Sequence, residues 1–591
     1  MSRTRLAGAA AGLVAACVAL AATLDAQRGA TPVLLAITGA TLIDGSGRPP
    51  APNHTVLIEG PRIIAVGPAG TVRIPANARI VNATGKFVLP GLIDGRAHWR
   101  GWTGELFLNH GITTIVDAGG PSDWILAVRD AERGGSIRGP RILTAAGAFD
   151  RRARADDIAA FEVRSGSTSR FDVAGADSAR SAVRALLVKG PDFINIGGDL
   201  TLDELRAITG EAHAVDVPVL GDFSDVDAAL EAGVDGIAHL SGVSQTLMTP
   251  AKGKEFRDGK IASPHAWIEQ GRTDALVARM IQRGTYLIPL LVADHGAAAP
   301  QARRFELANY DLLMRPELRY VPLTSALASL TFWRTLRSSS ATLGPSPFGE
   351  SVPPHILDEF RRGYVNAKEF VGRFARAGGR VVAGTGAGGT ASVPGISLHQ
   401  ELELLVDAGL TPMQALVSAT RAPAELLKKE SRVGTIATGK FADLVILDAD
   451  PLADIANTRK ISAVVKNGQL VDTSYHREYY TDFAEADSIG TTRAAHGVPV
   501  VTDVISVTMN QMSQVIHDGS PFDLVVRGYN FDTSSLIELN GRPLATTFTS
   551  ATELRARVPT ERIAAAGTYT VTVSTPWPGG GRSNITPLPV K

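Results

Sequence analysis

Residues 192–242 read DFINIGGDLTLDELRAITGEAHAVDVPVLGDFSDVDAALEAGVDGIAHLSG, and the order of elements in this stretch decides the fold. Three short, mostly apolar runs are predicted to be strands: residues 192–198, 217–223 and 236–242. Residues 201–213, between the first two runs, are predicted to form a helix. Strands that alternate with helices in this way indicate a parallel sheet with crossover helices.

The same alternation extends from about Leu89 to Arg432. Further strand-like runs occupy residues 113–119, 141–146, 285–291 and 380–386, and further helices are predicted over residues 178–189 and 354–377. A region of about 340 residues suits a closed (β/α)8 barrel of the TIM type. The alternative is an open, doubly wound sheet. The barrel is favoured because the sequence has no Gly-rich dinucleotide-binding loop.

Short β-rich segments flank this α/β region on both sides. Residues 33–88 contain a predicted hairpin at 55–67, TVLIEGPRIIAVG. Residues 433–471 cannot bury a core alone, so we expect them to complete one composite β-sandwich domain with 33–88. Residues 472–499 are polar and typical of a linker. Residues 500–591 alternate strictly between apolar and polar positions, which predicts a separate antiparallel β-sandwich.

The N-terminus has the pattern of an export signal. Arg3 and Arg5 precede an uncharged, Ala-rich apolar run over residues 6–24, and residues 1–26 are predicted to be a cleaved signal peptide. This predicts a periplasmic or secreted protein, with a membrane-spanning helix as the alternative. Cys17, the single cysteine, follows a Leu-Val-Ala-Ala stretch, so lipoprotein anchoring at Cys17 is a further alternative. Cleavage beyond Cys17 would exclude disulfides and Cys-ligated metals.

The overall composition is that of a globular protein with more than one folding unit. The chain has 591 residues, of which 44% are hydrophobic and 20% are charged. Lys and Arg together number 59, as do Asp and Glu, so no global field favours an acidic partner. We therefore expect no binding to nucleic acid.

Several motifs follow one another in a characteristic order. They are VLPGLIDGRAHW (88–99), HGITTIVDAGG (110–120), LHQELELLVDAGLTPMQALVSATRAPAELL (398–427) and VGTIATGKFADLVILDADPL (433–452). Together with the strand runs between them, these motifs resemble the amidohydrolase superfamily, in particular its imidazolonepropionase-like and dipeptidase-like members, over residues 37–471. The resemblance implies hydrolysis of C–N bonds at one or two divalent metals, normally zinc, at the mouth of the barrel. Such metals lower the pKa of a bound water to about 7.

The family's metal ligands are a His-x-His pair, a bridging modified Lys, two further His and a final Asp. The matching positions here are Arg96, His98, Asn195, Asp222, His239 and Gly386. A guanidinium has no lone pair to give to a metal, and an asparagine cannot be carboxylated. The resemblance therefore leaves His98, Asp222 and His239 as the residual candidates for metal ligands.

These three residues could in principle hold a single divalent metal. However, Arg96 lies two residues from His98 on the same strand face, which places a fixed positive charge where the metal would bind. We therefore predict a pocket without metal or other cofactor. In it, an Arg96–Asp222 ion pair replaces the metal, and Asp94 is the alternative partner of Arg96.

The N-terminal signal and the changed ligand positions together predict an exported pseudoenzyme. We expect it to keep a role in binding a small-molecule or peptide-like ligand or a partner. The alternative is an active hydrolase of amide or peptide-like bonds that uses a rebuilt single-metal or metal-free site. The phrases at Gly528–Phe531 and Gly567–Tyr569 resemble the immunoglobulin-like domain of plexins and some transcription factors. This resemblance implies a cell-surface or protein partner for residues 500–591, and a homodimer is a further expectation for such barrels.

The remaining histidines divide into two groups. His110, His213 and His399 lie on predicted helices outside the mouth and are expected to be structural. His265, His295 and His355 lie in or beside the long region 246–354 that we expect to fold over the pocket. Among these, Asp294 and His295 follow a predicted strand and are candidates for lining the site.

Overall fold

The computed structural model describes residues 33–150, 170–318, 320–321, 354–389, 392–476, 479, 500–506, 521–529, 531, 533, 535–550, 552–563, 567–574, 583 and 586–590. The predicted signal peptide with Cys17, and most of the predicted linker 472–499, lie outside these residues. Within the described part, no helix combines the length and the apolar character needed to cross a bilayer.

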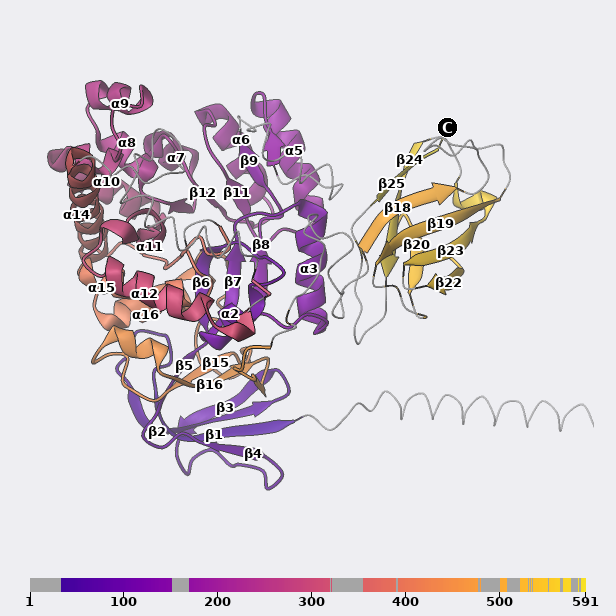
Figure 1. Cartoon of the computed structure of the whole chain (residues 1–591), viewed down its shortest axis with the longest axis horizontal. Helices are drawn as coiled ribbons and strands as arrows, with labels where there is room; N and C mark the ends of the chain where they lie inside the picture. Colours follow the sequence, from indigo (N-terminus) through magenta and orange to yellow (C-terminus); the bar gives the residue numbers. More distant parts are fainter. Residues whose placement is uncertain are drawn as a thin grey trace, which may run out of the picture.

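The two flanking segments meet in one eight-stranded sheet, which lies beneath the α/β region in Figure 1. Its strands are β1 (Leu34–Leu42), β2 (Ala51–Glu59), β3 (Arg62–Pro68), β4 (Arg79–Asn82), β5 (Phe87–Pro90), β15 (Leu444–Leu447), β16 (Ile461–Lys466) and β17 (Gln469–Leu470). β2 and β3 form the expected hairpin. β15 pairs antiparallel with β5, and β5 pairs with β1. The later segment therefore joins the sheet of the earlier one, as the sequence predicts for the composite domain.

The central α/β region contains two parallel sheets. One consists of β6 (Leu92–Ala97), β7 (Ile112–Asp117) and β8 (Arg141–Thr144). The other consists of β9 (Ala148–Asp150), β10 (Arg170–Asp172), β11 (Ile194–Ile196), β12 (Val219–Gly221), β13 (Gly236–Ala238) and β14 (Tyr286–Ile288). The mixed α/β class and the parallel pairing agree with the sequence-based prediction.

The predicted closed eight-stranded barrel is not present as one continuous sheet. The segment expected to be its last strand, residues 380–386, belongs to neither sheet. This segment and the adjoining Ala387 make only isolated parallel bridges, Leu287↔Val381 to β14 and Ala97↔Ala387 to β6. This segment contains Gly384 and Gly386, and glycine weakens strand formation. The backbone nevertheless connects the two sheets here, since the Gly95 N–H donates to the Ala383 carbonyl at 2.8 Å.

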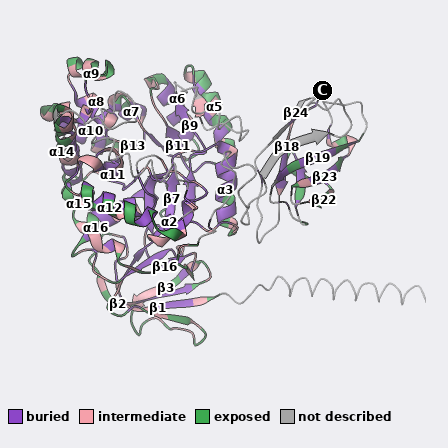
Figure 2. Cartoon of the chain, in the orientation of Figure 1, coloured by how far each residue is buried: buried purple, intermediate pink, exposed green. Residues whose placement is uncertain are grey.

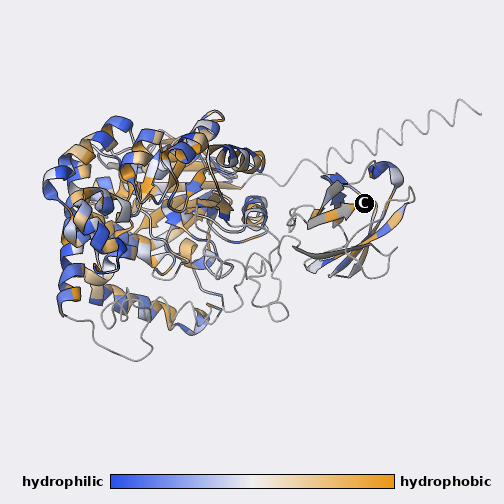
Figure 3. Cartoon of the chain, turned by 90° about the horizontal axis from the view of Figure 1, so that it is seen from above, coloured by the Kyte–Doolittle hydropathy of each residue, from blue (hydrophilic) through white to orange (hydrophobic). Residues whose placement is uncertain are grey.

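Helices cover the outside of these parallel strands. They are α2 (Gly104–Asn109), α3 (Ser122–Gly134), α5 (Ala176–Val188), α6 (Leu202–His213), α7 (Val226–Ala232), α8 (Ser241–Leu247), α9 (Pro250–Arg257), η1 (Pro264–Trp267), α10 (Gln270–Arg283), α11 (Leu291–Asp294), η2 (Gly296–Ala298), α12 (Ala302–Leu313), η3 (Pro316–Leu318), α14 (Pro354–Arg376), α15 (Ile396–Asp407), α16 (Pro412–Ser418), α17 (Arg421–Leu426) and η4 (Ile455–Arg459). Thr201 is the N-cap residue of α6 and forms a capping box with Glu204, so neighbouring residues determine where this helix starts. The strands are buried and the helices turn polar residues outward (Figures 2 and 3).

The described residues from 500 onward form two four-stranded antiparallel sheets, drawn in orange to yellow in Figure 1. The first contains β18 (Val500–Ser506), β19 (Phe522–Tyr529), β23 (Glu553–Val558) and β22 (Thr546–Ser550). The second contains β21 (Arg542–Pro543), β20 (Leu536–Leu539), β24 (Gly567–Ser574) and β25 (Thr586–Val590). Leu524, Ile537, Leu554 and Val573 belong to a hydrophobic core that is separate from those of the α/β region.

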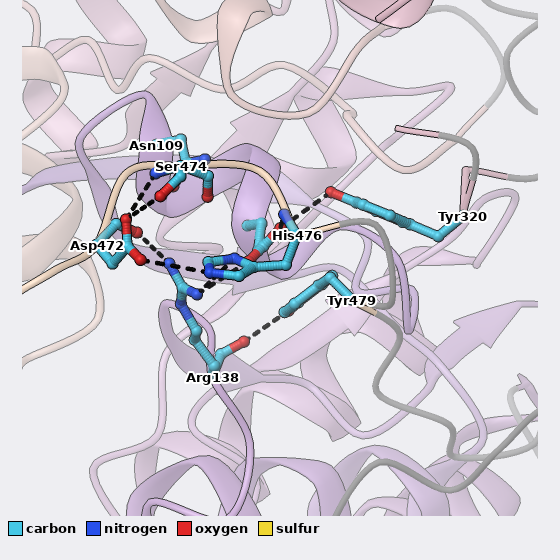
Figure 4. A network of polar contacts seen from close by, with 8 residues as sticks. Asn109, Arg138, Tyr320, Asp472, Ser474, His476 and Tyr479 are labelled. Atoms are coloured by element: carbon cyan, nitrogen blue, oxygen red, sulfur yellow. Dashed lines mark hydrogen bonds and ion pairs between the residues drawn. The ribbon is translucent and has the colours of Figure 1, made fainter. Parts of the chain in front are cut away.

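The chain that leaves the composite sheet is held against the α/β region by a polar network (Figure 4). At its centre is Glu105 of α2, which is fully buried. Its carboxylate accepts hydrogen bonds from the Arg138 guanidinium at 2.9 Å and from the His476 N–H at 3.0 Å. Tyr479 donates to the Arg138 carbonyl at 2.6 Å. These contacts anchor His476 and Tyr479 to the α/β region.

Replacing Glu105 should release this segment. Glu105→Gln removes the charge that compensates Arg138, and we expect it to destabilise the fold by about 2 kcal/mol. The melting temperature, followed by circular dichroism, measures this effect. Glu211→Gln is the matched control, because its ion pair with Arg184 lies at the surface and the change should leave the melting temperature unaltered. Equal melting temperatures for wild type and Glu105→Gln would contradict the anchoring role.

Candidate functional site

Arg96 lies at the carboxyl end of β6 and is the central charge of the site. Its residue is only 8% exposed, and its Nη1 donates to the amide oxygen of Asn195 on β11 at 3.1 Å. The Asn195 amide nitrogen donates in turn to the Ala118 carbonyl, just beyond β7, at 2.5 Å. Three parallel strands thus contribute groups to one buried cluster at their carboxyl ends.

The predicted Arg96–Asp222 ion pair is wrong. No such contact is present among the described residues, and the Asp222 carboxylate instead accepts a hydrogen bond from the Ser241 hydroxyl at 3.2 Å. Asn195 on β11 accepts the hydrogen bond from the Arg96 guanidinium. The charge of Asp222 acts on Arg96 only at longer range. Burial lowers the pKa of Arg96, and the negative charges of Asp222, Asp294 and Asp117 oppose that shift. The attraction is therefore shared by several carboxylates.

Asp94, the alternative partner, does not pair with the guanidinium either. Its carboxylate accepts from the Thr385 hydroxyl at 2.5 Å and from the Thr385 N–H at 3.1 Å. Burial raises the pKa of Asp94 to about 7. Beside it, the Gly386 N–H donates to the Arg96 carbonyl at 2.7 Å, which places Gly386 against Arg96. Asp94 thus orders the backbone around the site.

His98 and Gly386 lie on the two sides of the junction between β6 and residues 380–387. The His98 N–H donates to the Ala387 carbonyl at 2.7 Å. Burial first, and then the positive charges of Arg100 and Arg96, lower the pKa of His98 to about 3. His98 is consequently a neutral imidazole near neutral pH.

His239 follows β13 and forms a pair with Asp294 of α11. Its Nδ1 lies 2.8 Å from the Asp294 carboxylate. Burial would lower the pKa of His239, but the charge and hydrogen bond of Asp294 outweigh it and raise the pKa. Burial would likewise raise the pKa of Asp294, but His239 together with His295 and His265 lowers it. This pair joins elements that are 55 residues apart in sequence.

Backbone strain is concentrated at the same end of the strands. His239 has a φ of 61° and Leu290, after β14, has a φ of 50°. A left-handed conformation is unfavourable for a side chain with a Cβ atom and is often found at functional sites. Leu290 precedes the short helix α11, so this turn directs Asp294 back toward His239.

A cavity of about 720 Å³ adjoins the site at Asp294. It runs between the segment that precedes α12 and the helix α14, where Phe360 and Tyr364 provide apolar surface. Arg303 and Arg361 are among the residues that line it. Its size is in the range of pockets that hold small organic ligands. The cavity therefore offers an apolar chamber with cationic groups next to the His239–Asp294 pair.

The other histidines fall into two sets in the structure. His399 contacts Thr458 at 2.9 Å and the His110 carbonyl at 3.0 Å, and His213 contacts Asp235 at 2.8 Å, so these three are structural. His355 is exposed at the start of α14. His265 and His295 are buried, with ring centroids 4.3 Å apart, behind Asp294. Burial first lowers the pKa of His295 to about 4.

Two buried carboxyl groups were not singled out from the sequence. Asp117 ends β7 and accepts from the Trp99 N–H at 2.8 Å and the Thr144 hydroxyl at 2.9 Å. Glu401 of α15 accepts the N–H groups of Leu291 and Val292, and burial raises its pKa to about 8. A carboxylate at the end of a predicted strand was a usable signal for Asp117. Glu401 had no comparable signal within its helix.

The donor set around Arg96 does not match a binuclear metal centre. Among the described residues, no group of three or more His, Cys, Asp or Glu side chains is arranged to hold a metal ion. His239 is already engaged by Asp294, and Arg96 brings a cation next to both. These side chains form a charged and hydrogen-bonded cluster instead.

Comparison with known proteins gives the class of this scaffold. Residues 360–471 match the sequence profile of the amidohydrolase family. An adenine deaminase from Rubrobacter xylanophilus is 30% identical over 113 residues, which cover 16% of this chain and 18% of that enzyme. The chain thus spans less than a fifth of that relative's length. The likeness to the family profile is thus confined to residues 360–471, which run from within α14 to just past β17.

Solved structures extend the likeness to most of the fold. A molinate hydrolase is 22% identical with a TM-score of 0.53, covering 77% of this chain and 99% of that one. A Xaa-Pro dipeptidase with methionine bound in its active site is 19% identical with a TM-score of 0.51, covering 74% and 100%. These values show a shared fold.

The His239–Asp294 pair should give a pH-dependent contribution to stability. Because the pKa of His239 is raised and that of Asp294 is lowered, both are charged in moderately acidic solution. The attraction is complete between the ordinary aspartate value near 3.8 and the ordinary histidine value near 6.5, and it is lost as the pH rises through the raised pKa of His239. Asp294→Asn should therefore cost about 2 kcal/mol at pH 5.5 and clearly less at pH 9.

Melting temperatures of the two proteins at both pH values test this prediction. Asp203→Asn serves as the control, since its contact with Arg206 is an exposed pair at 3.8 Å. A difference that is the same at pH 5.5 and pH 9 would show that His239 is not charged in the pair.

Proposed function

We propose that this protein binds a small amide- or peptide-like ligand at the mouth of an amidohydrolase scaffold without the superfamily's two-metal chemistry. The observation that carries this proposal is the Arg96 guanidinium, which is buried and hydrogen-bonded to Asn195 at 3.1 Å. These two residues match the positions of a metal-binding histidine and of the bridging lysine in the family. A cation held there repels a divalent ion in a site with little water.

The cavity beside Asp294 supports a ligand of this kind. Phe360 and Tyr364 would pack against an apolar group of the ligand. The Arg96 guanidinium, which is hydrogen-bonded to the Asn195 amide, would bind a carbonyl or carboxylate group of the ligand. Such a ligand would lie across the His239–Asp294 pair. The role is then that of a pseudoenzyme that has kept its pocket.

We further propose export through residues 1–26 to the periplasm or the medium, with anchoring at Cys17 as the alternative. For residues 500–591 we propose an immunoglobulin-like domain that docks on a cell-surface or protein partner. Its separate hydrophobic core supports an independent module. A homodimer remains our proposal for the assembly.

Metal binding is the first test. Purified full-length protein, incubated with zinc and desalted, should hold far less than one equivalent by mass spectrometry. The quadruple variant Arg96→His, Asn195→Lys, Asp222→His and Gly386→Asp should regain zinc, because it restores the family's ligands. A triple variant that keeps Arg96 is the matched control and should not. Stoichiometric zinc in the wild type would overturn the proposal.

The second candidate function is metal-free hydrolysis of an amide bond. The specific observation in its favour is the 2.8 Å contact that orients His239 on Asp294. Above the raised pKa of His239 the imidazole is neutral, and its Nε2 would take a proton from water. Asp294 would stabilise the imidazolium formed in this step, and Arg96 would stabilise negative charge on the carbonyl oxygen.

Hydrolysis of a panel of blocked dipeptides, measured with excess chelator present, tests this candidate. If it is right, His239→Asn should lower kcat by at least about 100-fold, since general base catalysis contributes that much. His213→Asn is the control, because it removes a His–Asp contact away from the mouth. Absence of chelator-resistant turnover in the wild type would remove this candidate and leave the binding role.

A further inference from the structure

A second pocket lies at the opposite end of the parallel strands, where they begin. It has a volume of about 490 Å³ and lies between the α/β region and the composite sheet. Four cationic residues line it: Arg133 at the end of α3, Arg141 at the start of β8, and Lys429 and Arg432 after α17. Asp192 is the only acidic residue among the described residues that line it.

The Asp192 carboxylate forms ion pairs with some of these cations, so it is not an unpaired negative charge that would repel an anionic ligand. It is 7% exposed, and its carboxylate lies 3.4 Å from Arg129, 3.7 Å from Arg133 and 3.6 Å from Lys429. It also accepts from the Thr144 N–H at 3.1 Å. One buried carboxylate thus contacts three cations, of which Arg133 and Lys429 line the pocket.

Arg141 is also held in a defined position. Its Nη2 donates to the Asp443 carboxylate at 3.0 Å and to the Asn467 side-chain oxygen at 2.6 Å. Its guanidinium lies 3.8 Å from the centre of the Phe441 ring, and Arg62 lies 3.9 Å from the same ring. An arginine fixed in this way loses little freedom when it binds an anion.

Arg432 is the fourth cationic residue that lines the pocket, and no carboxylate among the described residues pairs with it. The residue is exposed, and its guanidinium has no ion-pair or hydrogen-bond partner among the described residues. It faces the pocket that Lys429 and Arg141 also line. The pocket is therefore positive, although the whole chain has equal numbers of acidic and basic residues.

We propose that this pocket binds the phosphate group of a small phosphate monoester. A phosphate dianion has enough oxygen acceptors to meet several of these cations at once, and arginine can bind it through two hydrogen bonds. The volume is also larger than one phosphate ion needs, which leaves room for an organic group beside Gln469 and Asn467. This site is independent of the mouth and of the function proposed for it.

Isothermal titration calorimetry on the full-length protein tests the proposal, at constant ionic strength set with sodium chloride. Glycerol 3-phosphate should bind saturably, inorganic phosphate more weakly, and glycerol not at all. Arg432→Gln should weaken binding of glycerol 3-phosphate by about tenfold, the loss expected for one charge-assisted hydrogen bond. It should not perturb folding, because the Arg432 side chain has no partner among the described residues.

Arg257→Gln is the matched control, since it removes the same charge from an exposed position on α9 and should leave the affinity unchanged. Lys429→Gln provides a second measurement and should also weaken binding. Three results would overturn the proposal: no saturable binding of glycerol 3-phosphate, binding of inorganic phosphate alone, or an equal loss of affinity in Arg432→Gln and Arg257→Gln.

Discussion

The arrangement of the mouth depends on the close contact between β6 and residues 383–387. Backbone hydrogen bonds run from Gly95 to Ala383 and from Gly386 to Arg96, and the Asp94 carboxylate binds Thr385 from within the junction. A Cβ atom on Gly95 would lie 2.2 Å from a Val382 methyl group, so only glycine allows this approach. The first and last parallel segments therefore meet here, and Arg96, His98 and Gly386 are brought together by that contact.

A buried guanidinium is costly unless its surroundings compensate it. Here the compensation is distributed: Asn195 provides a neutral hydrogen bond, and Asp222, Asp294 and Asp117 provide a negative potential without direct contact. A single ion pair would have left less room for a ligand, because both groups would be committed to each other. The distributed arrangement keeps a positive group available at the mouth, which is the basis of both functions that we propose.

The two ends of the parallel strands have different electrostatic character. At the carboxyl end, histidines and carboxylates lie around the buried Arg96, and the strained residues His239 and Leu290 turn the chain toward the cavity. At the other end, Asp192 gathers cations around a separate pocket. Gly60 and Pro61 from the earlier flank and Phe441 and Asn467 from the later flank line that second pocket, so both flanks of the α/β region contribute to it.

The sequence by itself determined the elements whose signals are local. The alternation of strands and helices, the hairpin around residues 59–62 and the capping box at Thr201 all depend on neighbours a few residues away, and the structure contains each of them. Only the tertiary structure decided which groups meet. Arg96 bonds to Asn195 and not to Asp222, and His239 finds Asp294 across 55 residues. Such partners depend on the spacing and direction of strand ends, and a difference of a few ångströms there separates an ion pair from a long-range attraction.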